Sequence, residues 1–233
     1  MSYFVYKSIA VFSRKIEKYL TTVSLKKYVY YALLLTLAFF LLLMIEITIP
    51  YFQLRDDVAF LRIKQVVLDN QVWKLAFYTH VFSACFCLLA GFTQFSNPLR
   101  TRHPHIHRWM GYLYVMVILG FSGPSGLIMS LYANGGIFSQ ISFTLLTTLW
   151  ILFTAKGVIE IRKGNVLNHQ KFLYRSYALT LSAITLRLWK LGLVVTLQPQ
   201  PMDLYRWVAW LGWVPNLLLI ELYIRTKIRS PFK

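Results

Sequence analysis

Long runs of apolar residues, separated by short polar segments, dominate this chain. Six such runs are long enough for about 20 residues of helix to cross the hydrocarbon core of a bilayer. They cover roughly residues 29–49, 73–94, 108–132, 140–160, 171–193 and 205–224. The pattern predicts an all-α, polytopic membrane bundle of six transmembrane helices.

The N-terminal segment, residues 1–28, is basic and amphipathic. Val5, Ile9, Phe12 and Ile16 fall on one helical face, and the lysines and arginines lie elsewhere. This pattern predicts a surface helix that lies against anionic lipid; a frayed tail is the alternative. The first apolar run is too long for a signal peptide. We therefore expect a tail over 1–28 and one membrane domain over 29–233.

Basic residues are distributed unevenly between the two sides of this predicted bundle. With the N-terminus inside, the cytoplasmic side holds 18 of the 25 lysines and arginines. The positive-inside rule then predicts that both termini are cytoplasmic. The same distribution accounts for the net charge of +17 without a nucleic-acid partner.

Two segments depart from the simple pattern of spans. The longest outer loop covers 51–72, and its stretch Val58–Leu68 suits a short surface helix. The third span contains Ser122-Gly123-Pro124-Ser125-Gly126, where proline removes a backbone hydrogen bond. A kink or local unwinding is expected there, either for packing or to line a cavity.

Polar residues inside the spans form two stripes at helical spacing. The stripe in the second span consists of His80, Ala84, Cys87, Gly91 and Gln94. The stripe in the fifth span consists of Ser176, Thr180, Ala183, Arg187 and Lys190, with His169 one heptad nearer the inner edge. Small residues in such stripes allow close helix packing. We assign Gln94, and Tyr114 of the third span, to that structural role.

Glu46, His80 and Arg187 lie at a similar depth in the outer half of the bundle. An unpaired arginine there costs about 2.5 kcal/mol or more, so Arg187 needs a partner. Glu46 is the nearest charge in depth, and the sequence predicts a Glu46–Arg187 ion pair with His80 bonded nearby. Such a cluster is either structural or a site for a proton or an anion.

Histidines at matched depth on different helices suggest a second chemistry. His107 and His169 share the inner edge and could hold a haem b iron from both faces, which is the only metal the sequence suggests. Both lie at helix starts near the interface, whereas a buried macrocycle needs ligands further in. The sequence has no phosphate loop, no CxxC and no HExxH motif.

Three segments together resemble a family of bacterial membrane proteins, domain of unknown function 2306, over about residues 73–195. The resemblance rests on His80 with Gly91-Phe92-Thr93-Gln94-Phe95, on His107-Arg108-Trp109-Met110-Gly111-Tyr112, and on Asn168-His169-Gln170-Lys171 with Thr185-Leu186-Arg187. It implies a multi-helix protein of the bacterial inner membrane whose typical motif residues correspond to His80, His107, His169 and Arg187. It implies no established reaction.

Three functions remain open at this point, and the sequence does not decide whether the protein is an enzyme. The first is a redox protein that binds haem b or a quinone through His80, His107 and His169. The second is a proton or anion carrier that uses Glu46, His80 and Arg187. The third is a non-catalytic subunit that binds another membrane protein.

Overall fold

The structure is a computed structural model that describes residues 27–28, 31–32 and 34–228. It divides into two units, Met1–Glu46 and Ile47–Lys233, and each is described by itself. The described residues form helices and turns, with no β-strand among them. The predicted N-terminal surface helix falls almost wholly outside the described residues and stays a prediction.

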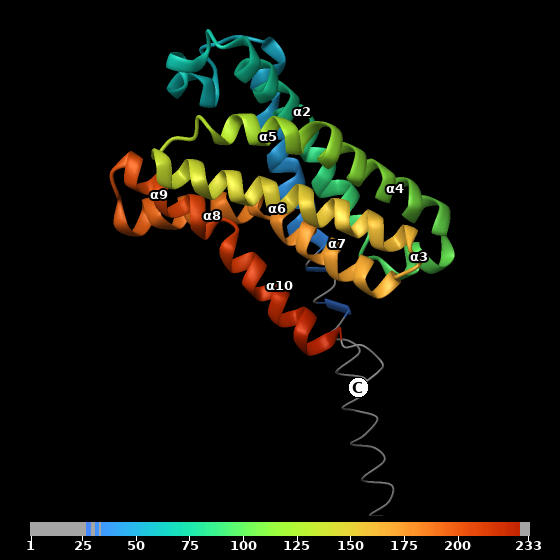
Figure 1. The fold of residues 1–233 in the computed structure, drawn as a ribbon. Helices are drawn as coiled ribbons and strands as arrows, with labels where there is room; N and C mark the ends of the chain where they lie inside the picture. Colours follow the sequence, from blue (N-terminus) through green and yellow to red (C-terminus); the bar gives the residue numbers. More distant parts are fainter. Residues whose placement is uncertain (1–26, 29–30, 33, 229–233) are drawn as a thin grey trace, which may run out of the picture. The chain divides into compact units, whose positions relative to one another are not determined.

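Six helical segments, some of them built from two or three elements, are long and apolar enough to cross a membrane, which confirms the six predicted spans. They run over Leu34–Gln53, Gln71–Thr93, Pro104–Ser130, Ile137–Arg162, Val166–Leu197 and Pro201–Lys227. Part of the first span belongs to the first unit. Figure 1 shows the elements of the second unit: α2 (Gln71–Thr93), α3 (Asn97–Arg102), α4 (Pro104–Met116), π-helical η4 (Val117–Ser122), α5 (Gly123–Ser130), α6 (Ile137–Arg162), α7 (Val166–Thr180), α8 (Ser182–Leu197), α9 (Pro201–Leu211) and α10 (Val214–Lys227).

Helix starts are fixed by capping side chains and by prolines. The Asn70 side chain accepts hydrogen bonds from the backbone N–H groups of Val72 and Trp73, at 3.0 and 3.1 Å, and so begins α2. Asn165 caps α7 in the same way. Pro104 begins α4, where its missing N–H leaves no helical bond unmade.

The third span keeps its helical hydrogen bonding through the segment where we expected a kink or unwinding. It widens into the π-helix η4 just before Pro124, and the N–H of Gly123 donates to the carbonyl of Ile118. Proline cannot continue an α-helical ladder, and a wider turn accommodates it. The irregularity is therefore a π-helical segment rather than an open stretch of backbone.

The fifth and sixth spans are each divided near the middle, which the sequence reading did not predict. The fifth divides at Leu181 and the sixth at Gly212 and Trp213. The Asn216 amide donates to the carbonyl of Ala178 at 3.2 Å, and the Thr185 hydroxyl donates to the carbonyl of Gly212. Side chains thus satisfy carbonyls that the two breaks release, as hydrocarbon surroundings require.

A small cap, residues 49–70, covers one end of the second unit. It contains three short 3-10 turns, η1 (Ile49–Gln53), η2 (Ala59–Ile63) and η3 (Gln65–Val67), in place of the single surface helix expected over Val58–Leu68. Ala59 has a φ of 43°, a left-handed conformation that no regular α-helix contains. We call this end the capped end. The opposite end, with α3 and the α6–α7 turn, we call the basic end.

Candidate functional site

His80 lies in α2 and faces the irregular part of the third span. Its Nδ1 is 2.9 Å from the carbonyl oxygen of Ser122, the last residue of η4. A carbonyl only accepts, so Nδ1 carries the proton in this contact and Nε2 holds the lone pair. Gly126 provides the space, since a Cβ there would lie 3.3 Å from the His80 ring. No hydrogen bond to Nε2 is present within the described part of the chain.

Arg187 lies in α8 and is close enough to interact electrostatically with His80 and with Tyr51 of the cap. Its guanidinium donates to the carbonyl of Ala183 on its own helix. Residues 47–228 contain four ion pairs, and none of them includes Arg187. Arg187 is thus a cation within electrostatic range of His80 and has no carboxylate partner from residues 47–228.

Glu46, the third residue of the predicted outer cluster, belongs to the first unit. Since each unit is described by itself, the predicted Glu46–Arg187 pair stays a prediction.

A dense cluster of hydroxyl groups lies deeper in the bundle, between α4, α6 and α7. The Tyr114 hydroxyl is 2.8 Å from both Ser176 Oγ and Thr180 Oγ1. Thr154 Oγ1 lies 2.7 Å from Ser176 Oγ, and the Trp150 indole donates to Thr180 Oγ1 at 2.9 Å. We call these five residues the hydroxyl cluster, and all five are buried.

The hydroxyl cluster can satisfy all of its own donors. Thr154 donates to the carbonyl of Trp150 at 2.7 Å, and Thr180 has the carbonyl of Ser176 within 3.2 Å. Because these protons end on helix carbonyls, the cluster acts as a tie between helices. Tyr114, which we assigned to packing, also packs its ring over Gly91, 2.9 Å from where a Cβ would lie.

His107 and His169 lie near the basic end, at the starts of α4 and α7. His169 Nδ1 is 2.8 Å from the carbonyl of Gly157 on α6, which leaves its Nε2 as the ring acceptor. His107 Nδ1 is buried and has no hydrogen-bond partner within the described residues. The two rings are close enough to interact electrostatically. The Gln94 amide donates to the His107 carbonyl at 3.1 Å and so ties α2 to the start of α4.

Lys64 of the cap is a buried cation that the sequence reading treated only as a loop charge. Its side chain is buried, donates to the carbonyl of Tyr132, and lies 5.7 Å from the ring centre of Phe60. Burial lowers the pKa of Lys64. Its position before the apolar Val66 and Val67 gave no periodic signal, so only the folded cap reveals it.

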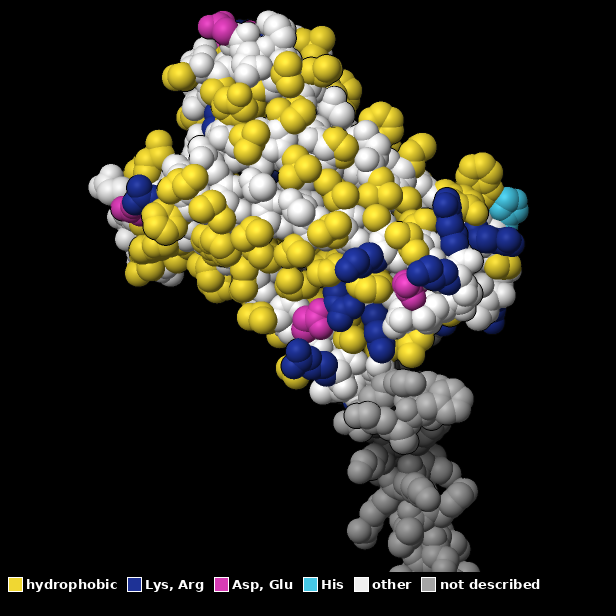
Figure 2. Space-filling view, viewed as in Figure 1, with side chains coloured by type: hydrophobic (Ala, Val, Ile, Leu, Met, Phe, Trp, Pro, Cys, Tyr) yellow, Lys and Arg dark blue, Asp and Glu magenta, His cyan; other side chains and the backbone are white. Residues whose placement is uncertain are grey.

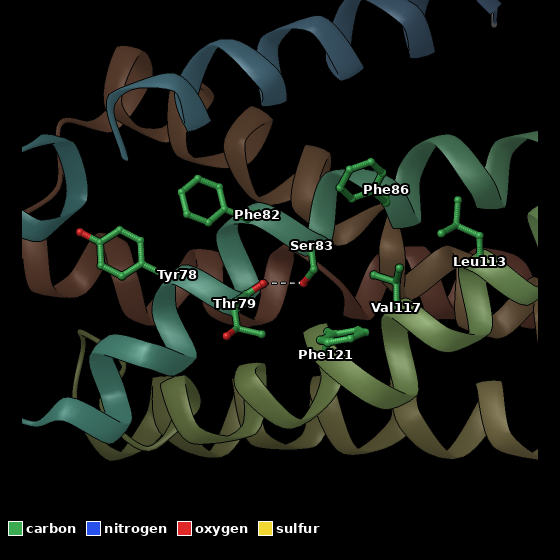
Figure 3. A pocket seen from close by; sticks show the side chains of 8 residues that line it. All are labelled: Tyr78, Thr79, Phe82, Ser83, Phe86, Leu113, Val117 and Phe121. Atoms are coloured by element: carbon green, nitrogen blue, oxygen red, sulfur yellow. Dashed lines mark hydrogen bonds between the residues drawn. The ribbon is translucent and has the colours of Figure 1, made fainter. Parts of the chain in front are cut away.

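An apolar groove of about 490 Å³ lies between α2 and the third span. Figure 3 shows the side chains around it: Tyr78, Thr79, Phe82, Ser83, Phe86, Leu113, Val117 and Phe121. Ser83 donates to the carbonyl of Thr79 at 2.6 Å, so its hydroxyl is engaged with the helix. Because most of the lining side chains are apolar, the groove suits a hydrocarbon chain.

Comparison with known proteins gives one match. No curated protein matches the chain, and no solved structure matches it. A family model described as "Predicted membrane protein (DUF2306)" matches residues 77–224. This range covers more than half of the chain and contains His80, His107, His169 and Arg187. The chain therefore belongs to this family of membrane proteins.

Proposed function

We propose that this membrane protein is a carrier that moves a small anion together with a proton, and that Arg187 and His80 form its binding site. The observation that supports the proposal is the Arg187 guanidinium, which lies in a transmembrane span without a carboxylate partner from residues 47–228. An unpaired arginine in the membrane costs about 2.5 kcal/mol or more, and a bound anion offsets that cost.

His80 supplies the link to protons. Histidine is the side chain whose ordinary pKa lies nearest to neutral pH. Arg187 disfavours a second positive charge on the His80 ring, and an anion bound between them removes that repulsion. Anion binding and protonation of His80 Nε2 therefore favour each other, and the coupling is reciprocal.

The third span offers a place for the movement that a carrier needs. His80 is held by the carbonyl of Ser122, at the junction of the π-helix η4 and α5. The junction contains Gly123, Pro124 and Gly126, which lack either a side chain or an N–H. A change in this hydrogen bond would couple the charge on His80 to the shape of the third span.

Proteoliposomes loaded with a pH-sensitive dye test the proposal. Inward gradients of sodium chloride, sodium phosphate and sodium succinate are applied in turn, and internal pH is followed. At least one anion should change internal pH faster than in empty liposomes. Arg187→Gln should abolish that difference, and His80→Gln should uncouple proton movement from anion uptake. Arg55→Gln, which removes an exposed charge in the cap, is the matched control. The proposal is wrong if Arg187→Gln retains the wild-type flux or if none of the three anions moves protons.

A second candidate is a redox protein with haem held by His107 and His169. It is supported by the buried, unpartnered Nδ1 of His107 and by the Gly157 carbonyl, which orients His169 as metal-binding histidines are often oriented. Protein produced with haem supplied should then show a Soret band that His169→Ala removes. A colourless protein would exclude this candidate.

A further inference from the structure

Along the exposed face of α4 at the basic end, the side chains change from basic to aromatic to apolar. His105, Arg108, Trp109, Tyr112 and Met116 follow the spacing i, i+3, i+4, i+7 and i+11, so they share one face. All five side chains are exposed. We call this face the α4 stripe.

The order of the α4 stripe matches the order of layers in a bilayer. Its basic residues come first and the aromatic pair follows. The apolar Met116 lies about 12 Å beyond Arg108, at about 1.5 Å per residue. Anionic phosphates, the interface and hydrocarbon follow one another over a similar depth, and tryptophan and tyrosine prefer the interface.

The aromatic side chains of the α4 stripe support one another but leave their polar atoms free. The Trp109 ring stacks on His105 with 6.2 Å between ring centres, and Tyr112 packs edge-on against Trp109 at 6.4 Å. Within the described residues, neither the Trp109 indole N–H nor the Tyr112 hydroxyl has a hydrogen bond. Both groups can therefore donate to a ligand outside the bundle.

The two arginines at the α4 stripe, Arg102 and Arg108, have no carboxylate partner within residues 47–228. Arg102 lies in α3 and Arg108 in α4, and both are exposed. Of the carboxylates near this end, Glu221 pairs with Arg175 and Glu160 accepts from Asn168. Figure 2 shows lysine and arginine side chains gathered at this end, beside an exposed histidine.

We propose that the α4 stripe, together with Arg102, binds an anionic phospholipid. Arg102 and Arg108 contact the phosphate, the Trp109 indole and the Tyr112 hydroxyl donate to its glycerol and ester oxygens, and Met116 contacts the acyl chain. Charge complementarity selects an anionic headgroup over a zwitterionic one. The site does not depend on the carrier function or on which side of the membrane the basic end faces.

Fluorescence quenching by brominated lipid tests this site directly. The chain has 7 tryptophans, so the Trp109 signal is taken as the difference between the wild type and Trp109→Phe. Both proteins are reconstituted in phosphatidylcholine that contains brominated phosphatidylglycerol or, at the same mole fraction, brominated phosphatidylcholine. Phosphatidylglycerol should quench Trp109 more strongly, and added salt should reduce the preference.

The arginines provide the decisive variants. Arg102→Gln and Arg108→Gln should each lower the preference for phosphatidylglycerol about fivefold, and the two substitutions are then combined in one double variant. Arg102→Lys with Arg108→Lys should keep most of it. Arg55→Gln with Arg62→Gln removes the same charge at the capped end and should change nothing. Equal quenching by the two lipids in the wild type would overturn the proposal. The proposal would also be overturned if the Arg102→Gln, Arg108→Gln double variant and the Arg55→Gln, Arg62→Gln double variant lost the same amount of preference. Overall charge would then explain the preference.

Discussion

Replacing Tyr114 by phenylalanine tests whether its buried hydroxyl stabilises the helix bundle or carries protons. The substitution keeps the ring that packs over Gly91 and removes one oxygen. That oxygen lies 2.8 Å from Ser176 Oγ and 2.8 Å from Thr180 Oγ1. Hydrogen bonds between membrane helices average about 0.6 kcal/mol and reach about 1.7 kcal/mol. Losing both contacts should lower the free energy of unfolding by about 1–2 kcal/mol.

Unfolding of the purified protein in mixed micelles, followed by circular dichroism as a denaturing detergent is added, measures this difference. Tyr112→Phe is the matched control, because it removes the same atom from the same helix at a side chain that is 67% exposed. It should leave the unfolding free energy unchanged. The reasoning fails if Tyr114→Phe unfolds like the wild type, or if Tyr112→Phe loses as much.

The same variant tests whether the hydroxyl cluster carries protons. Because Thr154 donates to the Trp150 carbonyl and Thr180 has the Ser176 carbonyl within reach, we read the cluster as a tie between helices. Tyr114→Phe should therefore keep the wild-type proton flux per folded molecule in proteoliposomes. A loss of flux with unchanged stability would instead make Tyr114 part of a proton path.

Three further predictions follow from single contacts. Gly126→Ala places a Cβ 3.3 Å from the His80 ring and should lower anion-coupled proton flux more than stability, measured as above. Asn216→Leu removes the amide that donates to the Ala178 carbonyl and should lower the free energy of unfolding by about 1–3 kcal/mol in the same detergent titration. Burial lowers the pKa of Lys64 below 10.5 in the folded cap, so the unfolded chain binds more protons between the two values. Cap stability, measured by thermal unfolding, should therefore rise with pH through that window, and Lys64→Met should flatten the rise; a wild-type curve that stays flat or falls would contradict this.

The transmembrane spans were predictable because bilayer thickness fixes their length, and runs of apolar residues of that length are visible in the sequence. The π-helix was anticipated only as an irregularity, because Pro124 signals a missing donor without saying how the helix adjusts. The division of the fifth span at Leu181 left no sequence signal. The Ala178 carbonyl next to this break accepts a hydrogen bond from Asn216, which lies in another span and far along the sequence.

Helical spacing predicted the depth of the site residues but not their partners. It assigned His80 and Arg187 to the outer half, and the two side chains are close enough to interact electrostatically. Spacing alone could not show that His80 bonds to a backbone carbonyl, because that carbonyl belongs to η4. Lys64 was missed for a similar reason, since its burial depends on the Tyr132 carbonyl of a distant turn.

Satisfaction of hydrogen bonds divides the polar groups of this bundle into two kinds. In the middle, the hydroxyl cluster can meet its donors within the protein, and ligand binding would have to break bonds already made. Outside this cluster, the Arg187 guanidinium, His80 Nε2 and His107 Nδ1 retain charge or donor and acceptor capacity that the described second unit does not use. Groups of the second kind gain most from a ligand, since an unpaired buried polar group costs about 1–3 kcal/mol. Ligand binding in this protein should therefore be sought at groups of the second kind, while the hydroxyl cluster ties α4, α6 and α7 together.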